Sequence, residues 1–318
     1  MGPMKRRLVT RNLIASAVSL TLLSPLSGSP VKEESDYTIR SDVRLVLLDV
    51  SVKDRGGGFV SGLSKDNFAV FENGHPQRIT AFANYDLPVT VGILVDESYS
   101  MTPKRADVLT AAQTFIEESN PRDEVFVLNF NDQVRRGLPG QVLFSDNIQQ
   151  LSSALHRGIP QGKTALNDAI VAGLQQLELG RCDKKTLVVI SDGGDNASKH
   201  KRREMLDMVE RNIATIYTIG LYDAEDADRD PGILRELAKI TGGEAYFPLS
   251  PSGMVPVCRR IAKDIRTRYT IGYTPQTENG SVLLRHIHVR VSAPGHARLF
   301  ARTRSGYRYD EGSNQKKK

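Results

Sequence analysis

The chain has 318 residues, of which 39% are hydrophobic, and it carries 43 Lys and Arg against 37 Asp and Glu. This composition excludes a wholly disordered chain, and the length suits one large α/β domain with a smaller module. Seven positive charges lie at the two ends of the chain, at Lys5, Arg6, Arg7, Arg11, Lys316, Lys317 and Lys318. Without them, the net charge of the remaining residues is about −1. Composition therefore gives no argument for a nucleic-acid partner.

Residues 1–30 are predicted to be an export signal. A basic start without acidic residues precedes an apolar, Ser-rich run from Leu13 to Leu26, and small residues follow it. This run is short and polar for a permanent transmembrane helix. The cleavage region has no Ala-x-Ala pattern, so an uncleaved signal that anchors the chain in the membrane is the alternative. No later segment is apolar enough to span a bilayer, and we expect the remainder to be periplasmic or extracellular.

Residues 36–85 are predicted to form an N-terminal β segment. The Val- and Leu-rich run 43–52 indicates a strand, and Gly56 to Gly58 indicate a loop after it. Two more strands are expected at Phe68 to Glu72 and Ile79 to Tyr85, with Asn73-Gly74 as the hairpin turn between them. So few strands do not form a stable unit alone.

Residues 86–266 are predicted to form an α/β domain, because apolar strands and amphipathic helices alternate from Val89 onward. This order predicts a Rossmann-like, doubly wound and mostly parallel sheet with helices on both faces. Strands are expected at 89–95, 125–130, 186–191, 214–221 and 244–247. Helices are expected at 104–118, 146–155, 165–179, 202–212, 231–240 and 252–266.

Residues 267–309 return to strand character, with strands expected at 269–273, 283–291 and 299–303. We expect this segment to join residues 36–85 in a small β-sandwich, with the α/β domain inserted between them, because neither segment alone has enough strands to bury a core. The polar tail 310–318 is expected to be disordered.

Oxygen-bearing side chains follow two strands of the predicted α/β sheet. Asp96, Ser98 and Ser100 form an Asp-x-Ser-x-Ser run after the first strand, and Asp192 ends the strand TLVVIS. Thr164 adds a hydroxyl in a loop that leads to a helix. Open α/β sheets bind ligands at the carboxyl ends of their strands. Hydroxyls and carboxylates suit Mg²⁺, with Mn²⁺ or Ca²⁺ as alternatives, and they do not suit zinc.

These five residues, Asp96, Ser98, Ser100, Thr164 and Asp192, match the metal-ion-dependent adhesion site (MIDAS) of von Willebrand factor type A (VWFA) domains, which residues 86–266 resemble. The resemblance implies the VWA fold, with the three hydroxyls binding the metal directly and the two aspartates acting largely through bound water. The strands before the domain and the run from Tyr269 to Pro275 after it are similar to the exported VWFA-related proteins of acidobacteria.

Two positions within the Asp-x-Ser-x-Ser run depart from the usual motif. Tyr99 stands where Gly is common, and its side chain would contact a partner, narrow the access or simply lie exposed. Glu97 adds a carboxylate, which would either raise the affinity for the metal or lie in solvent as an ordinary loop side chain.

Other motifs favour structural interpretations. Asp168 and Asp195 lie near the motif and are expected to accept hydrogen bonds in turns or at helix ends. The acidic residues between Asp223 and Asp230 lack the Gly and Glu of an EF-hand, and a solvated loop is favoured. Residues 158–164 are one position short of a phosphate-binding loop and follow a helix, so nucleotide binding is not expected.

His and Cys residues give no catalytic motif. Gly-x-Ser-x-Gly is absent, and none of the six His residues lies in a recognisable catalytic pattern. His286 and His288 share one face of a strand, where solvent exposure is favoured over metal binding. Cys182 and Cys258 are expected to be two unrelated buried thiols, although export would permit a disulfide. No enzyme is expected.

The function predicted from this constellation is adhesion or protein binding by a secreted domain. A Mg²⁺ ion held mainly by neutral hydroxyls would accept an Asp or Glu carboxylate from an unidentified partner protein. The alternative is a structural or assembly component of the cell envelope with an incidental or inactive metal site. An accessory role in a chelatase-type complex is disfavoured, because that chemistry is cytoplasmic and we expect this chain to be exported.

Overall fold

The computed structural model describes residues 45–221, 229–275 and 284–308. The predicted export signal, the C-terminal tail and most of the acidic loop at 223–230 lie outside these residues. Within the described part of the chain, no helix is both long and apolar enough to cross a bilayer.

A six-stranded sheet lies at the centre of the α/β domain. In the described residues its strand order is β10-β9-β8-β5-β6-β7, and every neighbouring pair is parallel except β6 with β7. Each residue of β5 and β6 is buried, which explains why these segments are runs of Val, Ile, Leu and Phe without alternation. The bounds are Val89–Asp96 (β5), Glu124–Phe130 (β6), Val134–Arg136 (β7), Lys184–Ser191 (β8), Thr215–Gly220 (β9) and Ala245–Tyr246 (β10).

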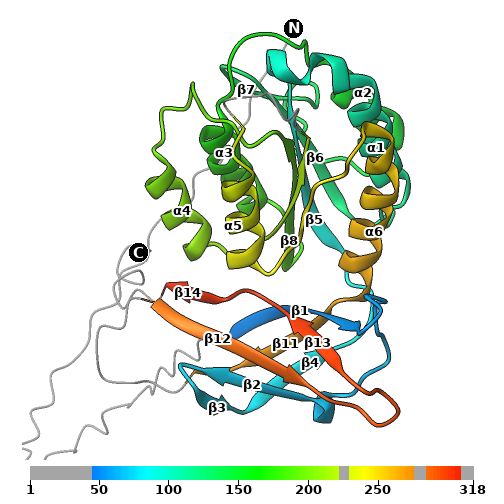
Figure 1. Ribbon diagram of the computed structural model, residues 1–318, viewed down its shortest axis with the longest axis vertical. Coiled ribbons are helices and arrows are strands. Elements are labelled where there is room, and N and C mark those ends of the chain that lie inside the picture. Colours follow the sequence, from blue (N-terminus) through cyan, green and yellow to red (C-terminus); the bar gives the residue numbers. More distant parts are fainter. Residues whose placement is uncertain (1–44, 222–228, 276–283, 309–318) are drawn as a thin grey trace, which may run out of the picture. The chain divides into compact units, whose positions relative to one another are not determined.

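Helices cover both faces of this sheet. Figure 1 shows α1, α2 and α6 on one side and α3, α4 and α5 on the other. Their bounds are Arg105–Glu117 (α1), Ile148–His156 (α2), Leu166–Glu178 (α3), Arg202–Arg211 (α4), Pro231–Thr241 (α5) and Met254–Thr267 (α6). The predicted α/β class with a doubly wound, mostly parallel sheet is confirmed.

The predicted start and stop signals of α5 have the expected chemistry. The Asp230 carboxylate accepts a hydrogen bond from the Ile233 amide at 3.0 Å and caps the first turn. Gly242 ends the helix at φ 80°, a conformation that a residue without Cβ adopts at little cost.

Strands from the two flanking segments pair with each other, and we call these strands, β1–β4 and β11–β14, the β module. Its described strands form two four-stranded sheets, β13-β1-β11-β4 and β14-β12-β2-β3. Apolar side chains from both sheets share one buried cluster, which includes Leu48, Val70, Tyr269 and Ile287. The bounds are Val46–Asp54, Phe68–Glu72, His75–Gln77, Ile79–Ala83, Tyr269–Tyr273, Leu284–Val291, Leu299–Arg302 and Gly306–Arg308.

The hairpin partner predicted for β2 is wrong. Asn73 and Gly74 do form the turn, with φ values of 49° and 84°. The strand that returns from it is the three-residue β3, and β4 pairs instead with β11 in the other sheet. Strands of three residues, such as β3, β7 and β14, are too short to show the alternation on which prediction depends.

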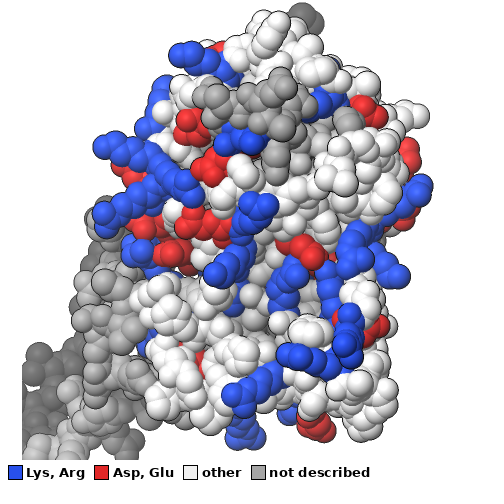
Figure 2. Space-filling model, in the orientation of Figure 1, with Lys and Arg blue, Asp and Glu red and all other residues white. Residues whose placement is uncertain are grey.

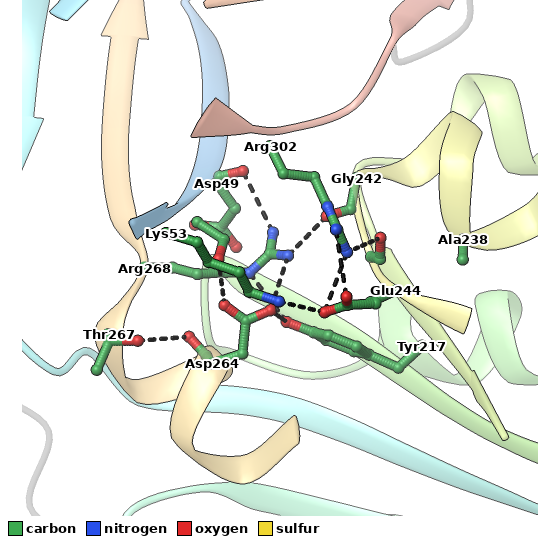
Figure 3. Close-up of polar contacts among 12 residues, drawn as sticks. Asp49, Lys53, Tyr217, Ala238, Gly242, Glu244, Asp264, Thr267, Arg268 and Arg302 are labelled. Carbon is green, nitrogen blue, oxygen red and sulfur yellow. Dashed lines mark hydrogen bonds and ion pairs between the residues drawn. The ribbon is translucent and has the colours of Figure 1, made fainter. Parts of the chain in front are cut away.

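A buried polar network joins α6 to β9 and to the β module (Figure 3). The Tyr217 hydroxyl of β9 donates to Asp264 of α6 at 2.7 Å and accepts from Arg268 at 3.0 Å. Ser51 of β1 also donates to the Asp264 carboxylate, and Arg268 donates to the Gly242 carbonyl. The last helix of the α/β domain is therefore fixed at its C-terminal end by contacts with both parts of the chain.

Charged side chains of both signs lie side by side over the α/β domain on the face shown in Figure 2. Lys and Arg side chains also gather where the α/β domain meets the β module. Some of them are paired there, because Lys53 and Arg302 both form ion pairs with Glu244. This distribution agrees with the small net charge left once the two ends of the chain are set aside.

Candidate metal site

Three loops meet at the carboxyl edge of the six-stranded sheet. β5 and β8 are parallel neighbours whose last residues lie level, with Val95 paired to Ile190. Asp96 therefore ends its strand beside Ser191, and Asp192 follows directly. After Asp96, the chain enters a 3₁₀ helix, η2 (Tyr99–Lys104), which turns Ser98 and Ser100 back over the strand ends.

Four of the five predicted ligands are linked by hydrogen bonds. The Ser98 and Ser100 hydroxyl oxygens lie 3.1 Å apart, and the Ser100 hydroxyl donates to the Asp192 carboxylate at 2.5 Å. Asp96 accepts one hydrogen bond from the Ser98 amide at 2.8 Å and another from the Ser191 hydroxyl at 2.6 Å. These contacts bring oxygens from separate loops to one place.

Thr164 is held at the same edge through the backbone of its loop. Its amide donates to the Asn196 side chain at 2.9 Å, and its carbonyl accepts from the Asn196 and Ala197 amides. The Tyr99 amide donates to the Gly162 carbonyl, which ties this loop to the Asp-x-Ser-x-Ser loop. Among the described contacts, the Thr164 hydroxyl forms no hydrogen bond with the other four side chains.

The two aspartates of the site are buried, and their negative charges repel each other. Asp96 and Asp192 are 2% and 3% exposed. Burial, followed by the negative charge of Asp192, raises the pKa of Asp96 to about 7, although hydrogen bonds from Ser191 and Ser98 act in the other direction. A cation between these carboxylates would relieve both effects, so the donor set fits a divalent metal.

The site differs in composition from a typical His, Cys and carboxylate centre. Among the residues that the structure describes, no group of three or more His, Cys, Asp or Glu side chains is placed to hold a metal ion. The candidate site instead combines two carboxylates with three hydroxyls, which are ligands that Mg²⁺ and Ca²⁺ accept and zinc does not favour.

Glu97 is neither an exposed loop side chain nor directed to the predicted metal position. It is 3% exposed and forms an ion pair with Arg105 of α1. Arg105 also donates to the Gly158 carbonyl at 2.6 Å. The ion pair therefore holds the loop between α2 and α3 against α1. Tyr99, in contrast, is 76% exposed at the edge of the site.

The structural interpretations of the neighbouring aspartates are confirmed. Asp168 accepts hydrogen bonds from the Lys199 and His200 amides and from the His200 ring. Asp195 accepts from the Asn167 side-chain amide at 2.5 Å. These contacts join the start of α3 to the loop after β8, and they help to place Thr164 and Asp192.

The predictions for the His and Cys residues are confirmed in part. His286 and His288 are both exposed on β12, as expected for a surface strand. Cys258 is buried and Cys182 is half-buried, and both thiols are free. The prediction of two buried thiols is therefore wrong for Cys182, which lies in a loop before β8 where neighbours cover only part of it.

Sequence reasoning missed three residues that support the site: Ser191, Asn196 and Arg105. The sequence predicts Ser191 only as the end of a strand, yet its hydroxyl donates a hydrogen bond to the Asp96 carboxylate. Its position beside an aspartate at the carboxyl end of a parallel strand was the available signal. No local signal marks Asn196 or Arg105, because their partners lie 32 and 8 residues away in the chain.

The α/β domain is doubly wound and presents Asp-x-Ser-x-Ser, Thr and Asp from three loops at one sheet edge. Residues 91–194 match the von Willebrand factor type A domain family, and this range contains all five predicted ligands. This part of the chain, within the six-stranded α/β domain, is therefore similar to a von Willebrand factor type A domain. No curated protein matches the sequence.

Three solved structures are similar to this chain at low sequence identity. A von Willebrand factor type A protein from Catenulispora acidiphila is 14% identical, with 77% of this chain and 74% of that chain covered and a TM-score of 0.50. The vWF domain of the type V pili tip protein Mfa5 from Porphyromonas gingivalis is 12% identical, with coverages of 57% and 95% and a TM-score of 0.47. An aerotolerance-related membrane protein from Bacteroides fragilis is 15% identical, with coverages of 56% and 98% and a TM-score of 0.44.

Proposed function

We propose that this chain is an exported, metal-dependent binding protein that captures a partner protein through a carboxylate. The proposed site holds Mg²⁺ through Asp96, Ser98, Ser100, Thr164 and Asp192, with Mn²⁺ and Ca²⁺ as alternatives. The observation that carries the proposal is the continuous contact from Ser98 through Ser100 to Asp192, beside the buried Asp96.

The residues of the site have separable tasks. Ser191 and the Ser98 amide orient the Asp96 carboxylate, while the Gly194 amide orients Asp192 at 2.9 Å. The hydroxyls of Ser98, Ser100 and Thr164 add neutral oxygens, so the site keeps a cation electron-poor. A bound Mg²⁺ supplies a coordination position at which a partner's Asp or Glu oxygen replaces water.

Export is part of the proposal because a binding protein of this kind acts on partners outside the cytoplasm. The basic start and the apolar run of residues 1–30 support it. Expression of the full sequence in a Gram-negative host, followed by fractionation and mass spectrometry of the N-terminus, tests it. Recovery of the intact N-terminus in the cytoplasmic fraction would contradict export.

Metal binding is tested by calorimetric titration of the purified chain with MgCl₂, MnCl₂ and CaCl₂. We expect saturable uptake of one ion by the wild type and its loss in Ser98→Ala. Ser153→Ala is the matched control, because this exposed serine of α2 lies outside the site. No uptake of any of the three ions by the wild type would contradict the proposal.

Partner capture is tested by pull-down from envelope extracts in Mg²⁺ and in EDTA. Capture by the wild type in Mg²⁺ alone, and its loss in Ser98→Ala, would support the proposal. Capture that is insensitive to chelation and to the mutation would contradict it and favour a structural component of the envelope.

A further inference from the structure

A pocket of about 270 Å³ opens next to the candidate metal site. Its walls come from the loop after β5, the hairpin of β6 and β7, and the loop between α2 and α3. The residues that matter to its chemistry are Glu97, Asn129, Arg136, Arg157, Gly158 and Ile159. Glu97 lies between Asp96 and Ser98 in the sequence, so this pocket and the metal site share one loop.

Two buried oxygens in the pocket wall lack a hydrogen-bond partner among the described residues. They are Oε1 of Glu97 and Oδ1 of Asn129, on side chains that are 3% and 5% exposed. The other polar atom of each side chain is occupied, since Glu97 Oε2 binds Arg105 and Asn129 Nδ2 donates to the Ala154 carbonyl at 2.9 Å. Both side chains are therefore held in orientations that leave an acceptor free.

Gly158 packs closely against one of these oxygens, where a larger residue would not fit. A Cβ atom at Gly158 would lie 2.2 Å from Glu97 Oε1. The loop therefore meets this oxygen through its backbone, and both Gly158 and Glu97 line the pocket. An acceptor buried without a partner is unfavourable, so a group that donates N–H bonds would be stabilised there.

The rim of the pocket carries positively charged hydrogen-bond donors in place of acceptors. Arg136 and Arg157 are exposed, and neither forms an ion pair within the described part of the chain. Together with Arg105, they disfavour a positively charged ligand. They also offer donors to an oxygen of the ligand.

We propose that this pocket binds a primary amide, such as the side chain of an Asn or Gln in the partner protein. A primary amide provides two N–H donors for the free acceptors and one carbonyl oxygen for the arginine rim, and it adds no charge. The partner's part in this proposal rests on the proposed function, whereas amide binding by the pocket does not. A partner segment would then place a carboxylate at the metal site and an amide in the pocket beside it.

The test compares three small probes of similar size: propionamide, propionate and propylammonium. Each is titrated into the isotope-labelled full chain, and the backbone amide signals of Gly158 and Asn131 are followed by NMR. We expect saturable shifts with propionamide alone, in Mg²⁺ and in EDTA alike. Binding that persists in EDTA supports the pocket even if the metal site fails its own test.

Two variants show whether the named side chains are responsible. Glu97→Gln keeps the bond to Arg105 but replaces the free acceptor by a donor, and we expect about tenfold weaker propionamide binding. Arg157→Ala is expected to weaken binding less, and the exposed Arg203→Ala on α4 is its matched control with no change. A pocket that holds water only, with no shift from any probe, would overturn the proposal. Equal responses to all three probes, or unchanged binding in Glu97→Gln, would also overturn it.

Discussion

The Arg268 guanidinium lies 3.4 Å from the Asp264 carboxylate, and both side chains are buried where the α/β domain meets the β module. The two residues are one turn apart at the end of α6, directly before β11 (Figure 3). Each also binds the Tyr217 hydroxyl. The junction between the two parts therefore depends on a charge pair from which water is excluded.

Asp264→Ala is expected to lower the free energy of unfolding by about 3 kcal/mol, because it leaves the Arg268 charge buried without its counter-charge. Urea unfolding measures the change. The control is Glu118→Ala, which removes an exposed ion pair with Arg259 and should cost less than about 1 kcal/mol. Equal effects of the two substitutions would contradict the role assigned to the buried pair.

Glu244 makes stability depend on pH. Burial by itself raises its pKa, but hydrogen bonds from Lys53 and Tyr246 and the charges of Arg302 and Lys53 lower the pKa to about 2. A carboxylate with a depressed folded-state pKa stabilises the fold above its unfolded value, near 4.5, and this contribution is lost as the pH falls toward 2.

We therefore expect Glu244→Gln to destabilise the chain at pH 6 by about 2 kcal/mol, and the difference from wild type to shrink as the pH falls from 5 toward 2. Urea unfolding at several pH values measures it. Glu118→Gln is the control, because its exposed carboxylate should give little difference at any pH. A constant deficit of Glu244→Gln across this range would show that the ion pairs are not its cause.

Substitutions of Thr164 test whether its hydroxyl is a metal ligand. In the part of the chain that the structure describes, only the backbone of Thr164 forms hydrogen bonds that hold it at the site. Thr164→Val keeps the shape of the side chain and removes the oxygen, whereas Thr164→Ser keeps the oxygen. If Thr164 is a ligand, MgCl₂ should raise the melting temperature of wild type and Thr164→Ser, since a ligand that binds only the native state stabilises it. Thr164→Val should lose most of this rise. An equal rise in Thr164→Val would remove Thr164 from the ligand set.

Gly92 lies in the central strand β5 where there is no room for a larger residue. A Cβ atom at this position would lie 2.4 Å from the Phe126 ring and 2.6 Å from a Leu187 methyl carbon. We expect Gly92→Ala to lower the free energy of unfolding by about 1 to 3 kcal/mol through overpacking. Gly56→Ala is the control, because its nearest neighbour would be at 3.4 Å. Equal stability of the two variants would contradict tight packing at β5.

Most of the helices and strands could be predicted from local patterns in the sequence. The strands Phe68–Glu72 and Tyr269–Tyr273 have the predicted bounds, and the positions of all six described helices are close to those expected. Hydrophobic period, helix caps and turn residues act over a few neighbours, so they can be read from the chain itself. The same holds for the motif residues after β5 and β8, because the ends of adjacent parallel strands must lie at one edge.

Contacts between distant segments were decided by the tertiary structure alone. The sequence does not reveal that β4 leaves its hairpin to pair with β11, or that Lys53 meets Glu244, 191 residues away. Nor does it show that Glu97 binds Arg105 and leaves one buried oxygen without a hydrogen-bond partner among the described residues. The sequence pattern around a residue determines which helix or strand it belongs to. Its contact partner in another element is determined only when packing brings the two elements together and excludes water between them.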